Sequence, residues 1–310
     1  MKLSWSPRNS ELARNPLGAS VAILVTLVLL APLMAMVGLS FMRQDGFALD
    51  TSFTLANYRS LIEPSDTATV WMGIPFYLKN PVPLILLIKS IFMSLIATLG
   101  VILAAYPMAY FLAFRVKRYK VMWLILITIP FWTSYLLRVF AWKIVLGFNG
   151  AINSGLKSIG LIDQPLEFLL YNPVAVMLTL THAWVAFAIL PIYVSLEKID
   201  RSLLEAATDL GDSRWRRFRR VTLPLSMPGV VSAALLVFIP TVGDYVTPTL
   251  VGGPGGIMIG NAIQTLFFKQ NDTPMGATIA IVMMLVVAAV VLLFLWAIGY
   301  RKMMQRGLRT

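Results

Sequence analysis

Residues 205–224 read EAATDLGDSRWRRFRRVTLP, the most charged stretch of a chain that is otherwise mostly apolar. Two short helical patterns meet there at Gly211, and Asp212 or Ser213 can cap the second one. One face of the first pattern carries Leu203, Ala207 and Leu210. A chain this apolar has little reason to keep such a segment unless a soluble partner docks on it. We therefore interpret this segment as the link between that partner and the rest of the chain.

The composition indicates a protein that crosses a membrane several times. The chain has 310 residues, of which 58% are hydrophobic and only 13% are charged, and its mean hydropathy is +0.78. Ordinary soluble domains are about one quarter charged. The chain contains no cysteine, which excludes disulfide frameworks, thiolate metal sites and thiol catalysis.

Six apolar runs are long enough to span a bilayer. The first, residues 18–42, carries no charge and is too long for the apolar region of a signal peptide, about 7–15 residues. A helix rises about 1.5 Å per residue, so such a run can cross roughly 30 Å of hydrocarbon. We expect an all-α membrane protein with spans near 18–42, 83–114, 121–147, 173–196, 228–251 and 276–300.

The distribution of Lys and Arg predicts the orientation. The tail 1–17, the turn 115–120, the connecting segment 197–225 and the tail 301–310 carry 3, 4, 7 and 4 of these residues, whereas the alternate loops carry 3, 1 and 1. Lys and Arg gather on the cytoplasmic side. We therefore expect both tails and the connecting segment to be cytoplasmic. The net charge of +12 then reports topology and does not indicate nucleic-acid binding. The long loop 43–82 is expected on the other side, as turns and short helices.

The order of residues in the connecting segment resembles the EAA loop of ABC importer permeases. Glu-Ala-Ala at 205–207 is followed after three residues by Gly211 and then, after nine further residues, by Val-Thr-Leu-Pro at 221–224. An alternative interpretation is an amphipathic helix pair whose arginines lie on anionic lipid. That alternative explains the arginines but not the order. The resemblance implies a short cytoplasmic helix in a groove of an ATPase subunit, with coupling residues Glu205, Ala206, Ala207, Gly211, Phe218, Leu223 and Pro224.

Each position in the motif has a physical role to fill. Glu205 is expected to start the docking helix close to the positive end of its dipole. Ala206 and Ala207 are small enough for a partner to approach closely, and Gly211 permits a turn that a Cβ would obstruct. Pro224 is expected to end the second helix before the fifth span begins.

The resemblance covers most of the chain and is to permeases of spermidine/putrescine-type ABC importers. It rests on IPFWTSYLLRVFAW (129–142), NGAIN (149–153), LIDQPL (161–166), LPIY (190–193), FIPTVGDYVTP (238–248) and LVGGP (250–254). Related branches import opines, aminoethylphosphonate or ferric iron, so these substrates remain alternatives. The family implies a type I importer architecture in the bacterial inner membrane. It also implies a second permease subunit, two copies of an ATPase and a periplasmic binding protein that delivers the substrate.

Asp244 is the candidate residue for the cargo, because an ionisable side chain inside a membrane segment indicates a pathway or a partner. Its carboxylate suits a cationic amine, and Tyr245 and Trp132 can add cation–π contact. The alternative is a structural Asp244 that caps a local helix break or pairs with Arg138.

Two other classes of function fit the sequence less well. A secondary transporter needs coupling-ion carboxylates near the middle of the bilayer, and apart from Asp244 the interiors of the spans offer none. An intramembrane enzyme needs a base and a nucleophile on facing helices, but the chain has one histidine, His182, and no cysteine. We therefore expect a transport subunit without a nucleotide motif, cofactor or metal of its own.

Overall fold

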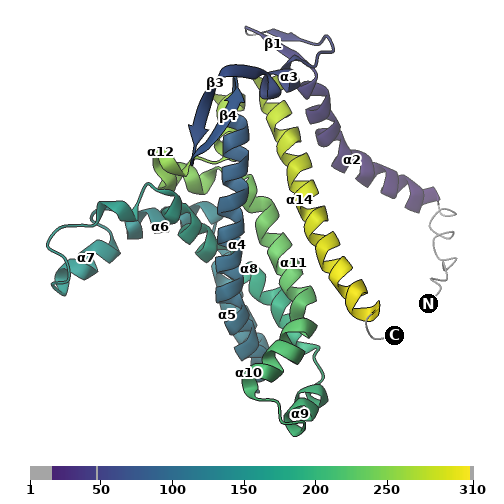
Figure 1. Cartoon of the computed structure of the whole chain (residues 1–310), viewed down its shortest axis with the longest axis vertical. Helices are drawn as coiled ribbons and strands as arrows, with labels where there is room; N and C mark the ends of the chain where they lie inside the picture. The colour runs from purple at the N-terminus through teal and green to yellow at the C-terminus, as the bar shows by residue number, and fades with distance from the viewer. Residues whose placement is uncertain (1–15, 47, 308–310) are drawn as a thin grey trace. The chain divides into compact units, whose positions relative to one another are not determined.

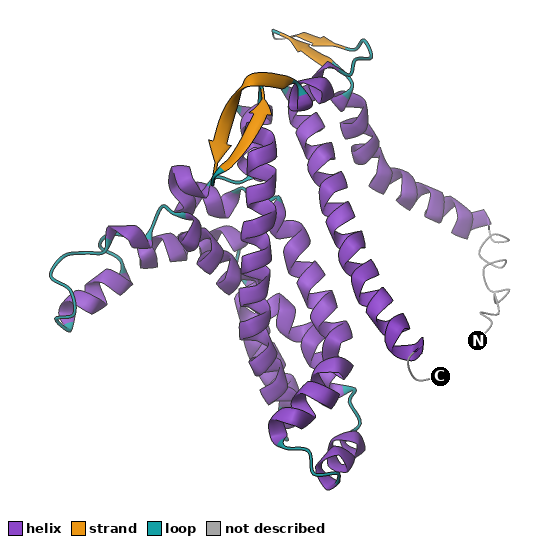
Figure 2. Ribbon diagram, in the orientation of Figure 1, coloured by secondary structure: helices purple, strands orange, loops and turns teal. Residues whose placement is uncertain are grey.

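The computed structural model describes residues 16–46 and 48–307 (Figure 1). Most of the predicted tail 1–17 and the last residues of the tail 301–310 thus lie outside the described residues. The chain divides into two compact units: unit 1 comprises Met1–Asn80 and Thr265–Met284, and unit 2 comprises Pro81–Gln264 and Leu285–Thr310. Figure 2 shows that the described secondary structure is helical except for two small hairpins.

Unit 1 begins with the apolar helix α2 (Pro16–Ser40). Its end is fixed by polar contacts at Ser40. The Tyr58 hydroxyl donates to Ser40 Oγ at 2.7 Å. The Ser40 carbonyl accepts from the side-chain amide of Asn57 at 3.3 Å and from Thr278 Oγ1 at 3.1 Å. The carbonyls at the end of a helix lack partners within the helix, and these donors satisfy one of them.

Two antiparallel hairpins lie in the loop for which we expected turns and short helices. Strand β1 (Arg43–Asp45) pairs with β2 (Ala48–Asp50), and after α3 (Ala56–Ile62), β3 (Pro64–Trp71) pairs with β4 (Ile74–Leu78). The two-residue turn between β3 and β4 has positive φ at Met72 and Gly73, as a type I′ hairpin turn requires. The strands are short and largely exposed, so they lack the apolar alternation that identifies a strand in a sequence.

The core of unit 2 is formed by three long helices that pack on one another (Figure 1): α4 (Val82–Phe114), α8 (Pro173–Glu197) and α11 (Leu223–Val242). Small side chains fill their contact surface. Fully buried alanines include Ala97, Ala105 and Ala109 of α4, Ala188 of α8 and Ala233 of α11. Small residues let helix backbones approach closely, which is how helices associate in a membrane.

The predicted span 121–147 is interrupted. It consists of α5 (Lys120–Thr128), the 3₁₀ turn η1 (Ile129–Trp132) and α6 (Tyr135–Leu146). Pro130 supplies no N–H to the helix, and Thr133 is extended at φ −83°, ψ 144°. Between α6 and α8 lie α7 (Ala151–Ser158) and η2 (Glu167–Leu169).

The predicted span 228–251 is shifted towards the N-terminus. A continuous helical stretch, Arg214–Val242, includes α11 and ends before a break at 243–245. The π-turn η4 (Pro248–Gly252), α12 (Gly253–Gly256), α13 (Ile259–Phe268) and α14 (Thr273–Gly307) follow. The turn at 252–256 is tied to α4, because Lys89 Nζ donates to the Gly255 carbonyl at 2.5 Å and Ser90 Oγ accepts from the Ile259 amide at 2.8 Å.

Within the described residues, five helices are long and apolar enough to cross a membrane: Val82–Phe114, Tyr135–Ser158, Pro173–Glu197, Arg214–Val242 and Thr273–Gly299. Helix α2 is a further apolar helix, and its segment Leu24–Ser40 is shorter than the five helices above. Its apolar side chains are exposed, with values of 61% for Leu27 and 66% for Leu29, as expected for a surface that faces lipid.

Candidate functional site

The connecting segment begins with a capped helix. Helix α9 (Arg201–Asp209) starts at Asp200, whose Oδ1 accepts a hydrogen bond from the Ser202 amide at 3.0 Å. This backbone hydrogen bond lowers the pKa of Asp200 below its usual value. Glu205 therefore lies in the middle of α9, and our expectation that it starts the docking helix is wrong. The cap lies five residues earlier, at Asp200, and aspartate is a preferred N-cap residue that we did not predict from the sequence.

The helix ends in a glycine turn. Gly211 has φ of +84°, in the left-handed region that the turn prediction requires. The Asp212 amide donates to the Ala207 carbonyl at 3.0 Å and the Gly211 amide donates to the Thr208 carbonyl at 2.9 Å. This pair of bonds is the Schellman motif, in which glycine adopts the left-handed conformation without the strain that a side chain would add.

The second helix does not stop at Pro224. It runs through α10 (Arg214–Arg217) and the π-turn η3 (Phe218–Thr222) into α11, and Ser213 caps its start by accepting from the Arg216 amide at 3.4 Å. In the π-turn the Leu223 amide donates to the Phe218 carbonyl, five residues back. A proline ring clashes with the carbonyl four residues earlier in a regular helix. The wide turn before Pro224 relieves that clash, so the helix continues.

The predicted coupling residues divide into an outer and an inner set. Glu205, Ala206, Gly211 and Pro224 are exposed, whereas Ala207 is buried at 8% and Phe218 and Leu223 are half-buried. Polar contacts link the second helix to the turn and to α9. Arg220 lies 3.5 Å from the Asp212 carboxylate and Arg217 Nη1 donates to Thr208 Oγ1 at 2.5 Å. The outer set thus lies on a helix pair whose relative placement is held by side chains.

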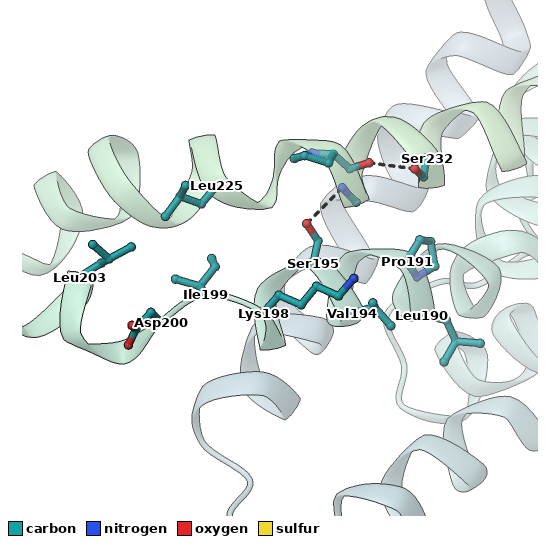
Figure 3. A pocket seen from close by; sticks show the side chains of 12 residues that line it. Leu190, Pro191, Val194, Ser195, Lys198, Ile199, Asp200, Leu203, Leu225 and Ser232 are labelled. Atoms are coloured by element: carbon teal, nitrogen blue, oxygen red, sulfur yellow. Dashed lines mark hydrogen bonds between the residues drawn. The ribbon is translucent and has the colours of Figure 1, made fainter. Parts of the chain in front are cut away.

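A groove of about 690 Å³ opens where α8, α9 and α11 meet (Figure 3). Its lining is mainly apolar and comprises Leu190, Pro191, Val194, Ser195, Lys198, Ile199, Asp200, Leu203, Leu225, Pro228, Gly229 and Ser232. At its base α8 and α11 approach closely, because the Gly229 amide donates to Ser195 Oγ at 3.3 Å. A Cβ at Gly229 would overlap the Pro191 carbonyl and Ser195 Cβ, so only glycine allows this approach.

The second candidate, Asp244, lies in the break after α11 and is half-buried. Its Oδ1 accepts from the Val246 amide at 2.9 Å and the Thr247 amide at 3.5 Å, and its Oδ2 accepts from the Tyr135 hydroxyl at 2.5 Å. The Tyr135 hydroxyl is also 2.7 Å from Thr247 Oγ1. Asp244 therefore caps the break, as the structural alternative expected, and it also joins α6 to the chain after α11.

The other residues expected around Asp244 make further contacts of their own. Trp132 is 88% exposed at the end of η1. Tyr245 is 45% exposed, and its carbonyl accepts from the side-chain amide of Asn261 at 3.0 Å. Arg138 Nη1 donates to the Ala183 carbonyl at 2.8 Å and its guanidinium lies 5.8 Å from the Tyr135 ring.

Tyr135 was not predicted from the sequence as a partner of Asp244. The two residues are 109 positions apart, and no local pattern connects them. The only signal was that both lie in stretches that carry the family resemblance.

Comparison with known proteins identifies the family. Residues 105–305 match the family described as binding-protein-dependent transport system inner membrane component. The chain is 34% identical to the spermidine/putrescine transport system permease protein PotB of Salmonella typhimurium over 93% of this chain and 94% of that protein. It is 36% identical to PotB of Escherichia coli K12, covering 88% and 93%, and 32% identical to PotB of Haemophilus influenzae, covering 86% and 87%.

A solved structure shares the fold. A chain of a bacterial ABC transporter that imports the acidic polysaccharide alginate aligns with a TM-score of 0.66 at 17% identity, covering 96% of this chain and 99% of that one. This likeness confirms the predicted helical importer fold. The related proteins are named as permeases and not as enzymes, in agreement with the predicted transport subunit. The match over 105–305, the relatives that span nearly the whole chain, and the apolar helices lead to one conclusion: this multi-pass protein belongs to the family of inner-membrane components of binding-protein-dependent transport systems.

Proposed function

We propose that this chain is the permease subunit of an ATP-driven importer and forms half of the translocation pathway for spermidine, putrescine or a related polyamine. The observation that carries the proposal is that relatives 32–36% identical over 86–93% of this chain are named for spermidine and putrescine transport. In this proposal a periplasmic binding protein delivers the substrate and a second permease subunit completes the pathway.

The connecting segment supplies the contact with a homodimeric ATPase. Its outer set, Glu205, Ala206, Gly211 and Pro224, is exposed and available to a partner. Glu205 and Ala206 lie on a capped helix that ends in a glycine turn. From the turn the chain continues as one helical stretch, Arg214–Val242, into the core of unit 2. A displacement of the segment would therefore act directly on α11.

The proposed orientation places both termini and the connecting segment in the cytoplasm. It is supported by the excess of Lys and Arg in the tails and in segment 197–225. The exposed arginines at the start of the second helix, Arg214, Arg219 and Arg220, would then lie near the anionic inner leaflet.

Asp244 is the proposed contact for the cationic cargo. A carboxylate offers about four lone-pair sites, and the contacts described use one on Oδ2 and share Oδ1 between two amides. Acceptor capacity therefore remains for an ammonium group. The Tyr135 hydroxyl and the backbone amides hold the carboxylate in one orientation, which prepares it to receive a cation.

The proposal is tested by uptake of radiolabelled spermidine into proteoliposomes that contain the complete complex, with binding protein outside and ATP inside. We expect ATP-dependent uptake that unlabelled putrescine reduces and that an opine or aminoethylphosphonate leaves unchanged. Uptake of one of those other compounds in place of spermidine would refute the polyamine assignment but not the permease function.

A further inference from the structure

An aromatic cluster connects the second helix of the connecting segment to α4. The Phe218 ring is stacked on Trp215, with centroids 5.4 Å apart and an interplanar angle of 20°. Its other contacts are edge-on, to Tyr106 at 5.8 Å and Tyr110 at 6.3 Å, both on α4. The family motif led us to expect Phe218 at the ATPase surface, but its ring faces α4.

Tyr106 contacts the same stretch a second time, beyond the π-turn. Its hydroxyl lies 2.8 Å from Ser226 Oγ in the first turn of α11, and Ser226 is fully buried. Ser226 Oγ also donates to the Leu223 carbonyl at 3.1 Å, and either hydroxyl can be the donor in the bond between Tyr106 and Ser226. The ring of Tyr106 thus touches Phe218, where the π-turn starts, and its hydroxyl holds Ser226, past its end.

The π-turn that Tyr106 bridges is the irregular part of the helical stretch that connects the segment to α11. A single π-turn inside an α-helix is less regular than the helix around it, and such turns are frequent at functional sites. Without a contact that spans the π-turn, a displacement at Glu205 or Gly211 could change the conformation of Phe218–Thr222 and leave α11 in place. With Tyr106 attached on both sides of the turn, the same displacement moves α4 and α11 together.

We infer that Tyr106 is a positioning residue for transport, which stiffens the π-turn and transmits movement of the connecting segment to α4 as well as to α11. This inference rests on the proposed coupling function. It predicts that the bond between Tyr106 and Ser226 sets how much transport each ATP hydrolysed produces, beyond any effect on folding.

The test measures spermidine uptake and ATP hydrolysis together, in proteoliposomes with the complete complex and its binding protein. Tyr106→Phe keeps the ring and removes the hydroxyl, and Ser226→Ala removes the other partner of the same bond. We expect each variant to lower uptake per ATP roughly twofold to tenfold, the range that corresponds to one net hydrogen bond. The double variant should fall no further than the single ones, because both changes remove one bond.

Tyr110→Phe is the matched control, since Tyr110 is on the same helix and touches the same ring, and the structure describes no hydrogen bond from its hydroxyl. It should keep the wild-type ratio. Unchanged uptake per ATP in Tyr106→Phe and Ser226→Ala, with or without poorer recovery of the complex, would overturn the inference while leaving the permease function intact. A wild-type complex without ATP-driven uptake would refute the proposed function itself and the inference with it.

Discussion

Asp244 illustrates how one residue can serve both structure and transport. Its carboxylate caps the helix break and receives the Tyr135 hydroxyl, so removal of the charge must affect local structure as well as any cargo. The sequence indicated an important carboxylate, because an ionisable group within a membrane segment is costly. It could not indicate Tyr135, because that contact depends on how α6 packs against residues more than a hundred positions away.

At this residue we predict that Asp244→Asn lowers spermidine uptake roughly tenfold while basal ATP hydrolysis changes little. Asparagine retains an oxygen that can accept from the Val246 amide, but it loses the charge that an ammonium group needs. A hydrogen bond to a charged group contributes ~1.5–3 kcal/mol, and about 1.4 kcal/mol corresponds to a factor of ten. Both activities are measured on the same preparation.

Tyr135→Phe serves as the comparison, because it removes a hydrogen bond from Asp244 and keeps the carboxylate. Its effect on uptake should be smaller than that of Asp244→Asn. An equal loss of uptake and ATP hydrolysis in Asp244→Asn would instead assign Asp244 a purely structural role.

At the scale of elements, apolar length predicted the helices well and their interruptions poorly. The helices α4 and α8 coincide closely with the predicted spans 83–114 and 173–196. The span 121–147 is broken at Pro130, and the helix into α11 passes Pro224 without ending. A proline disfavours a regular helix in both places. Whether the chain breaks or widens there depends on tertiary contacts, which periodicity does not contain.

The hairpins were not predicted from local sequence patterns, whereas two features of the helix pair were. Strands β3 and β4 were not predicted, because their residues lack the apolar alternation that identifies a strand. Their pairing and the turn at Met72 and Gly73 are apparent only in the structure. In contrast, Gly211 and Ser213 act locally, through a left-handed turn and an N-cap; the sequence predicted the turn at Gly211 and left Asp212 and Ser213 as alternative caps. These two features depend on neighbouring residues, whereas the contact between Asp244 and Tyr135 depends on distant packing.

The side of the membrane on which the connecting segment lies can be tested directly, because the chain has no cysteine. Leu210 is 86% exposed in the segment and Leu161 is 68% exposed in the loop between α7 and η2. We predict that a membrane-impermeant maleimide labels Leu161→Cys in intact spheroplasts and labels Leu210→Cys only after the membrane is permeabilised. The reverse pattern would contradict the proposed orientation.

At the scale of the whole molecule, the chain spans most of the length of its relatives and shares a fold with a solved importer chain. Its relatives are covered over 87–94% of their length, and the alginate transporter chain is covered over 99%. The central claim is that such a subunit is driven through the connecting segment. The three core helices of unit 2 and the exposed helix pair are consistent with that role. Binding of the partner ATPase to the segment is the direct test of it.

The most direct measurement is recovery of the ATPase with the tagged protein after purification in mild detergent. We compare wild type with Gly211→Val and Gly160→Val; both glycines have positive φ, +84° and +71°, with open space around a Cβ. A valine in this conformation costs about 1–3 kcal/mol. We therefore expect at least about fivefold less ATPase with Gly211→Val, at equal membrane insertion, and wild-type recovery with Gly160→Val. Absence of the ATPase from the wild-type preparation, or equal recovery with all three proteins, would contradict the account.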